Sequence, residues 1–248
     1  MTTKRRYLYR PPPRNHPALR RLFLTKPLLA PLPPSVDLRP LFLPPRDQGQ
    51  EGCCSGFGAA ALRESVLAIL NGLANVAYLS PAYLYARTRM IEGSFPQDAG
   101  ATVADELTTL ENYGVCLETD LPYNQDPSEA PAPHDDVHAV PFRISSFQPV
   151  AADPVSIESA LAGNQAVVFG MPVHSSFERT GADGLVAVPA PGEQCLGGHC
   201  MVACGYTHSA ALLTVRNSWG PGWAVGGYCF LPFSLISSFF EAYVIPVQ

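Results

Sequence analysis

The stretch DQGQEGCCSGFG at residues 47–58 decides the fold, because it places two adjacent cysteines in a glycine-rich segment before a helix-forming one. From Cys54 onward, apolar residues recur at helical spacing, and Asn71-Gly72 supplies a stop signal. At a helix N-terminus, free backbone N–H groups and the helix dipole favour thiolate, which is the nucleophilic form of cysteine. A lone cysteine before a helix is usually a packed, inert thiol, so Cys54 needs partners elsewhere in the chain to be a credible nucleophile.

The composition indicates a folded globular protein. The chain has 248 residues, of which 47% are hydrophobic and 15% charged, enough for one large domain or two lobes around a cleft. It contains no apolar run of about 18 residues and no uninterrupted apolar leader, so we expect no membrane span and no classical secretion signal. Seven scattered cysteines favour a thiol-reducing compartment, so we expect a cytoplasmic protein or one exported by a non-classical route.

Charge divides the chain into an arm and a body. Residues 1–36 hold eight of the sixteen Lys and Arg and no acid, so the remainder carries eight basic against 21 acidic side chains. Prolines interrupt the first 34 residues and favour extended chain over helix. We therefore predict an N-terminal arm over residues 1–34 and a folded domain over residues 35–248. A disordered basic tail that touches nucleic acid or a membrane is the alternative.

The body is predicted to place helices before strands. Further helical segments are expected at residues 102–113 and 157–162, and strands at residues 166–173, 199–206 and 211–217. This order is typical of an α+β protein with two lobes.

The last two predicted strands can form a hairpin that brings His199 and Asn217 together. With a turn centred near His208, Asn217 lies opposite His199 and Val215 opposite Met201. The Asn amide oxygen can then accept a hydrogen bond from one imidazole nitrogen, leaving the other nitrogen for a thiol.

A metal site built from Cys200, Cys204 and His199 is the competing interpretation of this hairpin. Strand alternation argues against it, because both cysteines point to the face opposite His199.

Three sequence blocks together resemble the papain-like cysteine peptidases, and in particular the bacterial branch that includes xylellain. Gln48-Gly49-Gln50-Glu51-Gly52-Cys53-Cys54 resembles the segment around that family's nucleophile, and Gly198-His199 and Asn217-Ser218-Trp219-Gly220 resemble its His and Asn blocks. The resemblance covers roughly residues 35 to 247. It implies a papain-like two-lobe fold, with a helical left lobe, a β-rich right lobe and the active-site cleft between them.

The resemblance also implies roles for individual residues. Cys54 is the expected nucleophile, His199 the acid–base group and Asn217 the residue that orients the imidazole. Gln48 would donate to the oxyanion with the Cys54 backbone N–H.

Residues Gly100, Gly198 and Trp219 are expected to contact substrate, and Trp219 also to shield the Asn–His hydrogen bond from water. No metal and no cofactor are expected. The implied substrates are peptides or proteins, cleaved internally through an acyl-enzyme, and we expect a monomer with no nucleic-acid or membrane partner.

Two departures from the family pattern leave alternatives open. Glu51 replaces a disulfide cysteine of many relatives, and Ser55 replaces the aromatic residue that usually follows the nucleophile, removing an apolar wall beside Cys54. One alternative is a catalytically dead or slow peptide-binding protein, and another is an acyltransferase or deamidase that uses the same residues.

The basic arm is expected to occupy and inhibit the active-site cleft of its own chain, because its positive charge faces a negatively charged body. It is too short and too rich in proline to form the long inhibitory helix of many family prosegments, so inhibition would work by local blockage.

Overall fold

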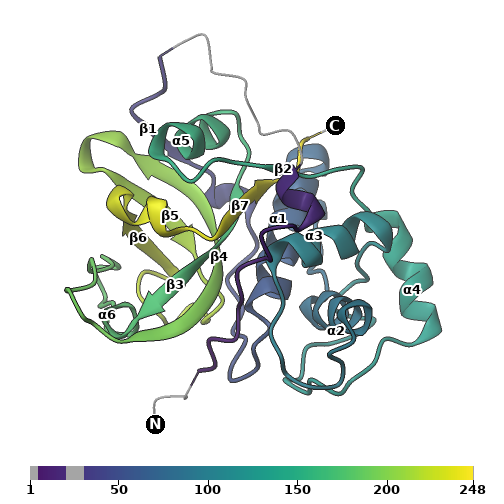
Figure 1. The fold of residues 1–248 in the computed structure, drawn as a ribbon. Coiled ribbons are helices and arrows are strands. Elements are labelled where there is room, and N and C mark those ends of the chain that lie inside the picture. Colours follow the sequence, from purple (N-terminus) through teal and green to yellow (C-terminus); the bar gives the residue numbers. More distant parts are fainter. Residues whose placement is uncertain (1–4, 21–30, 248) are drawn as a thin grey trace.

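Helix α1 (Cys54–Asn71) runs along the boundary between a helical lobe and a sheet lobe in the computed structural model, which describes residues 5–20 and 31–247 (Figure 1). The other α-helices are α2 (Pro81–Glu92), α3 (Val103–Asn112), α4 (Pro133–Ala139), α5 (Pro154–Ala162) and α6 (Ser175–Glu178). Short 3-10 helices span Pro17–Arg20, Arg39–Leu41, Leu73–Asn75, Val140–Phe142, His208–Ala210 and Phe233–Ser238. The strands are β1 (Ser35–Asp37), β2 (Gln148–Pro149), β3 (Val167–His174), β4 (Cys195–Thr207), β5 (Leu212–Arg216), β6 (Tyr228–Pro232) and β7 (Glu241–Val244).

Local signals explain where the helices begin and end. Helix α1 starts at Cys54, as predicted, and ends before Gly72, which has a φ of +79°. In α2 the side chain of Ser80 accepts a hydrogen bond from the Tyr83 N–H, and in α3 Thr102 accepts one from Asp105 N–H. These side-chain caps satisfy N–H groups that the first helical turn leaves unpaired. The predicted helices at residues 102–113 and 157–162 are confirmed as α3 and α5.

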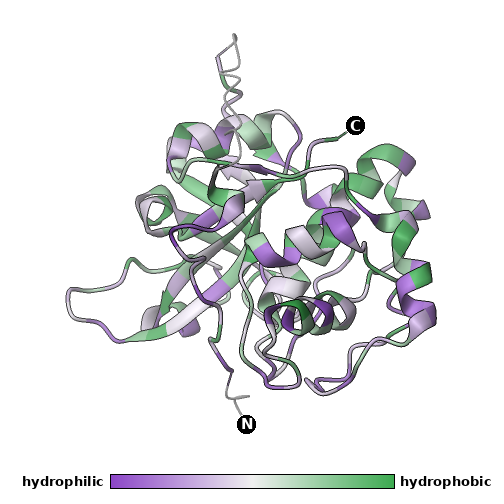
Figure 2. Ribbon diagram, turned by 45° about the vertical axis from the view of Figure 1, so that its right-hand side comes forward, coloured by the Kyte–Doolittle hydropathy of each residue, from purple (hydrophilic) through white to green (hydrophobic). Residues whose placement is uncertain are grey.

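The sheet is antiparallel throughout and has the strand order β2-β7-β3-β4-β5-β6, with β1 pairing on β4. The three predicted strands correspond to β3, β4 and β5, although β4 begins four residues earlier than expected. Helix α1 contacts β4 on one side and α2 and α3 on the other. The helices carry both hydrophilic and hydrophobic residues (Figure 2). The expected α+β organisation in two lobes is confirmed.

The predicted register of the β4–β5 hairpin is wrong by two residues. Val215 pairs with Ala203, not with Met201. The turn is longer than expected because the 3-10 segment His208–Ala210 occupies it, which displaces the pairs next to the turn by three residues. A register shift between Ala203 and Gly205 then reduces the displacement to two.

This error leaves the functional expectation intact. Side chains alternate faces along a strand, so a slip of two residues returns each side chain to the same face, whereas a slip of one would not. His199 and Asn217 therefore still point to the same side of the sheet and remain in contact.

Candidate active site

Three elements bring the candidate catalytic residues together at the boundary between the lobes. Cys54 is the first residue of α1, His199 lies in β4, and Asn217 directly follows β5. All three are buried, with Cys54 0% and His199 1% exposed.

The contact between His199 and Asn217 fixes the orientation of the imidazole. His199 Nε2 lies 2.8 Å from Asn217 Oδ1, and the same oxygen accepts a hydrogen bond from the Ser218 N–H at 2.8 Å. An amide oxygen accepts but does not donate, so the imidazole carries its hydrogen on Nε2. His199 Nδ1 is buried and has no hydrogen-bond partner among the described residues. The second ring nitrogen is therefore available for a thiol proton.

Burial holds both the thiol and the imidazole in their neutral forms. It raises the pKa of Cys54 to about 12, an effect opposed by hydrogen bonds from the backbone N–H groups of Cys200 and Ser55. Burial also lowers the pKa of His199 to about 4; the hydrogen bond to Asn217 opposes this, and the positive charge of Arg5 adds to it. Desolvation penalises each charged form in the occluded cleft.

Gln48 lies beside this group, in the loop before α1. Its amide Nε2 donates to the Glu51 carbonyl at 2.8 Å, and its Oε1 accepts from the Ser218 hydroxyl at 2.5 Å. The backbone N–H of Gln48 also donates to the Ser218 carbonyl at 2.9 Å. These bonds tie the loop before α1 to the segment that carries Asn217.

Ser55, which replaces the aromatic residue expected beside Cys54, has a polar partner in the structure. It is fully buried, and its hydroxyl donates to Glu106 at 2.9 Å. Glu106 also accepts from Thr88 at 3.0 Å, and burial raises its pKa to about 8. Ser55 thus belongs to a buried polar network that connects α1, α2 and α3.

Glu51, at the position of the missing disulfide cysteine, is also buried. Its carboxylate lies 3.9 Å from the Arg89 guanidinium, and burial raises its pKa to about 7. All seven cysteines of the chain are free thiols.

The N-terminal arm runs between the sheet lobe and the helical lobe (Figure 1). Leu8 and Tyr9 form isolated bridges with Gly198, on the sheet side. On the helical side, a Cβ placed on Gly100 would come 2.0 Å from the Leu8 carbonyl oxygen. A Cβ on Gly198 would come 2.4 Å from the Tyr9 carbonyl oxygen. Two glycines predicted as substrate-binding residues are therefore the points where the arm backbone approaches each lobe.

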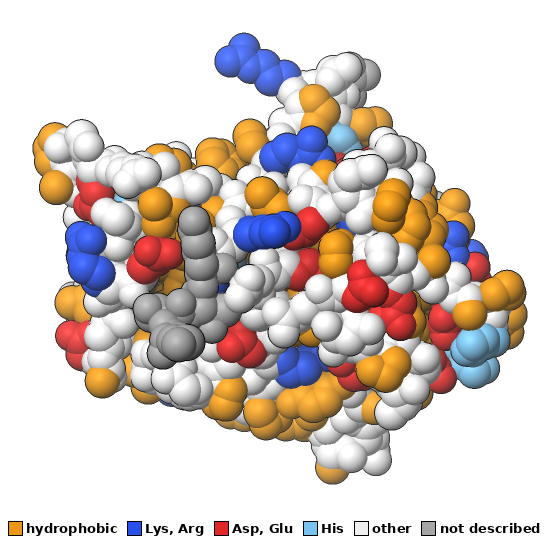
Figure 3. Space-filling view, turned by 90° about the horizontal axis from the view of Figure 1, so that it is seen from below, with side chains coloured by type: hydrophobic (Ala, Val, Ile, Leu, Met, Phe, Trp, Pro, Cys, Tyr) orange, Lys and Arg blue, Asp and Glu red, His pale blue; other side chains and the backbone are white. Residues whose placement is uncertain are grey.

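Ion pairs fasten the arm to acidic residues of the helical lobe and of the loop before α1. The pairs are Arg5–Asp47 at 2.9 Å, Arg6–Asp98 at 3.0 Å and Arg10–Glu92 at 3.6 Å, and His16 Nε2 also lies 2.9 Å from Asp105 Oδ1. Figure 3 views the end of the molecule where the arm emerges, and acidic and basic side chains are interspersed there. Residues 1–4 and 21–30 of the predicted arm lie outside the described residues.

One arm residue fills a pocket of its own. The Tyr9 ring packs where Gly170 lacks a side chain and stacks on Phe240 at 6.1 Å between ring centroids. Its hydroxyl donates to Glu241, which also accepts the Val103 N–H at 2.8 Å. Glu241 could not be predicted as a partner of the arm, because the sequence shows it only as a single acid in an apolar C-terminal segment.

Trp219 lies against the imidazole, as the sequence predicted. Its ring centroid is 5.1 Å from that of His199, and Phe177 and Trp223 pack on it at 5.3 and 4.9 Å. This aromatic cluster packs beside His199, whose hydrogen bond to Asn217 is buried.

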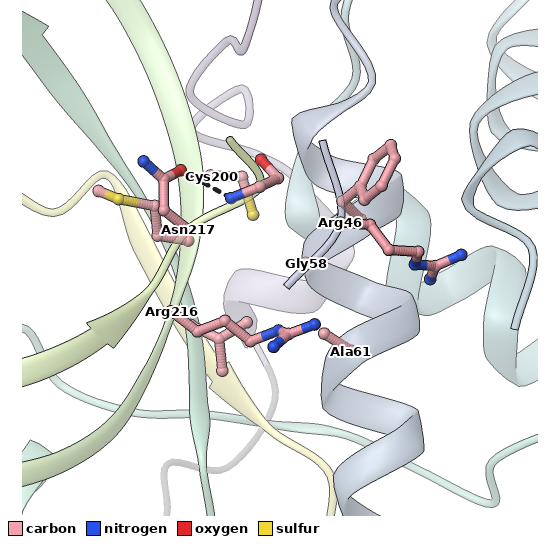
Figure 4. A pocket seen from close by; sticks show the side chains of 10 residues that line it. Arg46, Gly58, Ala61, Cys200, Arg216 and Asn217 are labelled. Atoms are coloured by element: carbon pink, nitrogen blue, oxygen red, sulfur yellow. Dashed lines mark hydrogen bonds between the residues drawn. The ribbon is translucent and has the colours of Figure 1, made fainter. Parts of the chain in front are cut away.

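A narrow pocket lies behind the candidate nucleophile, between α1 and the sheet. Figure 4 shows Gly58 and Ala61 of α1 on one side and Cys200 and Asn217 on the other, with Arg216 reaching between them. Across residues 5–20 and 31–247, no group of three or more His, Cys, Asp and Glu side chains is arranged to hold a metal. Nor does any helix of these segments have the length and apolar character to cross a membrane.

Comparison with known proteins adds an independent line of evidence. The family profile described as "Papain family cysteine protease" matches residues 32–233. An uncharacterized peptidase C1-like protein of Acanthamoeba polyphaga mimivirus is 30% identical over 202 residues, covering 77% of this chain and 65% of that protein. Cysteine proteinase 3 of Entamoeba histolytica is 26% identical over 204 residues, with 80% and 62% covered. The chain thus spans less than two thirds of the length of these curated relatives.

Solved structures are similar over more of their length. Xylellain, a cysteine protease from Xylella fastidiosa, superposes with a TM-score of 0.88 at 27% identity, covering 100% of this chain and 99% of that one. Digestive procathepsin L 3 of Tenebrio molitor gives a TM-score of 0.74 at 20% identity, covering 96% and 76%, which supports the fold alone.

Proposed function

This chain belongs to the papain family of cysteine proteases, and we propose on that basis that it hydrolyses peptide bonds through Cys54, His199 and Asn217. The observation that carries the proposal is the 2.8 Å hydrogen bond from His199 to Asn217, which leaves Nδ1 of the ring unpartnered among the described residues. Cys54 supplies the sulfur at the start of the helix that faces this strand.

The chemistry follows from these groups. The Cys54 thiolate attacks the peptide carbonyl, forming a C–S bond and an oxyanion. The His199 imidazolium gives its Nδ1 proton to the leaving amine as the C–N bond breaks, which leaves a thioester. His199 then takes a proton from water, the water attacks the thioester, and the C–S bond breaks to release the acid. Asn217 keeps the ring in the required orientation.

The oxyanion is stabilised by the Cys54 backbone N–H and the Gln48 side-chain amide, each worth about 3 kcal/mol in comparable sites. One hydrogen of the Gln48 amide is donated to the Glu51 backbone carbonyl, with 2.8 Å between Nε2 and the oxygen. The amide carries two hydrogens, so the second remains for the oxyanion.

Substrates are peptides or proteins that bind in the cleft now held by the arm. Gly100 and Gly198 let a second backbone approach from the two lobes, as their contacts with Leu8 and Tyr9 indicate. Trp219 forms the wall beyond His199.

The arm, residues 1–34, inhibits the peptidase domain, residues 35–248. It covers Gly100 and Gly198, and its burial of the site keeps the Cys54 thiol and the His199 imidazole neutral, so the reactive ion pair is disfavoured. Three arginines of the arm pair with body acids, so salt weakens its hold.

The test uses the full chain, folded and then cut. A site-specific protease recognition sequence is inserted after the exposed Pro31, and the arm is removed after cutting by gel filtration in high salt. Peptide hydrolysis and labelling of Cys54 by a peptidyl epoxide are measured before and after the cut. We expect both to rise after arm removal, and we expect salt to raise the rates of the uncut protein.

Each alternative function predicts a different result. Neither labelling nor turnover after arm removal indicates a catalytically dead peptide-binding protein, and labelling without measurable turnover indicates a slow one. Products in which an added amine replaces water indicate acyl transfer, since the thioester is common to both reactions. Equal rates before and after the cut, at every salt concentration, contradict inhibition by the arm.

A further inference from the structure

Arg5 of the arm sits in a site that matches a guanidinium on three sides. Its Cζ lies 4.7 Å from the centroid of the Trp219 ring. Its Nη1 donates to Asp47 Oδ1 at 2.9 Å and to the Gly49 carbonyl at 3.3 Å. The Arg5 side chain is only 15% exposed although it lies at the start of the described chain. We call the Asp47 carboxylate, the Gly49 carbonyl and the Trp219 ring face the cation seat.

The protein body builds this seat without help from Arg5. Asp47 and Trp219 are paired as an antiparallel bridge. The Asp47 carboxylate also accepts the Gly49 N–H at 2.9 Å, which holds the side chain toward the seat. Trp219 is packed by Phe177 and Trp223 on its other sides. The seat therefore remains in place when the arm leaves.

The seat lies on the side of the cleft where the leaving part of a substrate must run. His199 protonates the leaving amine, so the chain beyond that amine passes the imidazole. Trp219 is the next ring, 5.1 Å from His199 between centroids, and the Tyr7 ring meets both rings edge-on at 6.2 Å. Arg5 precedes Tyr7 by two residues in the sequence, which is the spacing of side chains on one face of an extended chain.

We propose that the cation seat is a substrate subsite that selects arginine on the leaving-group side of the scissile bond. The proposal rests on the peptidase activity proposed above. A guanidinium can stack on the indole and donate to Asp47 at the same time, whereas a lysine ammonium is a compact point charge. Arginine is therefore preferred over lysine, and both over neutral side chains. In the intact chain, Arg5 occupies the same subsite.

The test uses the folded full chain after cutting and arm removal. Peptides share one acyl side and carry arginine, lysine, citrulline or leucine at each of the first three leaving-side positions in turn. Citrulline keeps the planar shape of arginine but lacks its charge. At one position we expect kcat/KM for arginine to exceed that for citrulline about tenfold, the combined effect of a cation–π contact and a half-exposed ion pair.

Two variants locate the effect. Asp47→Asn should lower the arginine-to-citrulline ratio, because it removes the ion pair and leaves only the cation–π contact with Trp219. Asp37→Asn is the matched control. Asp37, on β1, forms an ion pair with Arg39, and its side chain is 48% exposed, against 52% for Asp47. The control variant should keep the ratio of the unmodified protein. A binding measurement runs in parallel, with a synthetic peptide of residues 5–14 and the same peptide carrying citrulline for Arg5.

The outcomes separate this inference from the proposed function. Cleavage at equal rates for arginine and citrulline at all three positions, or a ratio unchanged in Asp47→Asn, overturns the cation seat and leaves the peptidase standing. If no peptide is cleaved, the proposed function fails. In that case about tenfold tighter binding of the arginine peptide supports the seat, and equal binding overturns it as well.

Discussion

Tyr9→Phe should loosen the arm and expose Cys54 to alkylation in the intact chain. Tyr9 is 3% and Glu241 5% exposed, so the phenol donates to a carboxylate in a buried pocket. At pH 8 that carboxyl is mostly charged, because burial raises its pKa only to about 7, while the pKa of Tyr9 lies well above its usual value. A hydrogen bond to a charged group contributes about 1.5–3 kcal/mol, so its loss should raise the open fraction about tenfold to a hundredfold.

The assay follows alkylation by iodoacetamide in the full chain at pH 8, with each cysteine quantified by peptide mass spectrometry. Cys195 is exposed and should react at the same rate in every variant, which makes it an internal standard. Tyr7→Phe is the matched control. The Tyr7 hydroxyl donates to Glu178 at 2.7 Å in an exposed position, so its loss should change the labelling rate of Cys54 less than about threefold.

Two results would refute this reasoning. One is a Tyr9→Phe variant that labels at Cys54 as slowly as the unmodified protein. The other is a larger effect from Tyr7→Phe, which would mean that the buried carboxylate is not what holds the arm.

The remaining predictions concern the catalytic group and the buried network. In the arm-free enzyme, Cys54→Ser should abolish peptide hydrolysis and Cys53→Ser should retain it; the reverse result would move the nucleophile to Cys53. Asn217→Ala should lower kcat at least about tenfold with little change in Tm, because it frees the imidazole that performs proton transfer; an unchanged kcat would contradict the orienting role. Burial raises the pKa of Glu106 to about 8, against about 4.3 unfolded. Its contribution to the free energy of unfolding is therefore complete below pH of about 4.3 and is lost as the pH rises through 8. The free energy of unfolding, measured with urea, should accordingly fall less between pH 5 and pH 8 in Glu106→Gln than in the unmodified protein. An equal fall in both proteins would exclude Glu106 as a source of the pH dependence.

The helix that begins at Cys54 could be predicted because short-range signals define it. The glycine-rich segment ends where α1 begins, and Gly72 ends the helix with a positive φ that few other residues adopt. Such signals act over a few residues and need no knowledge of the rest of the chain.

The contact between His199 and Asn217 could be predicted although the register could not. Their common face depends only on whether the slip is even, and the long turn and the register shift between Ala203 and Gly205 together displaced the pairing near His199 and Asn217 by two residues. The exact pairing depends on the conformation of the turn, for which HSA at residues 208–210 gave no strong signal.

Contacts between distant segments lay beyond the sequence. The hydroxyl of Ser55 donates a buried hydrogen bond to Glu106, which is 51 residues away in the sequence. Tyr9 and Glu241 are separated by 232 residues. Nothing in either local sequence indicates a partner, because only the packing of the two lobes brings these side chains together.

The arm is covalently joined to the domain whose cleft it fills, and this makes occupancy of the cleft independent of how much protein is present. Once the connection is cut between the arm and β1, the same contacts hold two separate molecules, and their association depends on concentration. Dilution after the cut would then favour dissociation of the arm from the domain, and reconcentrating the products would partly restore their association. Activation would thus depend on the volume into which the cut protein is released as well as on the cut itself.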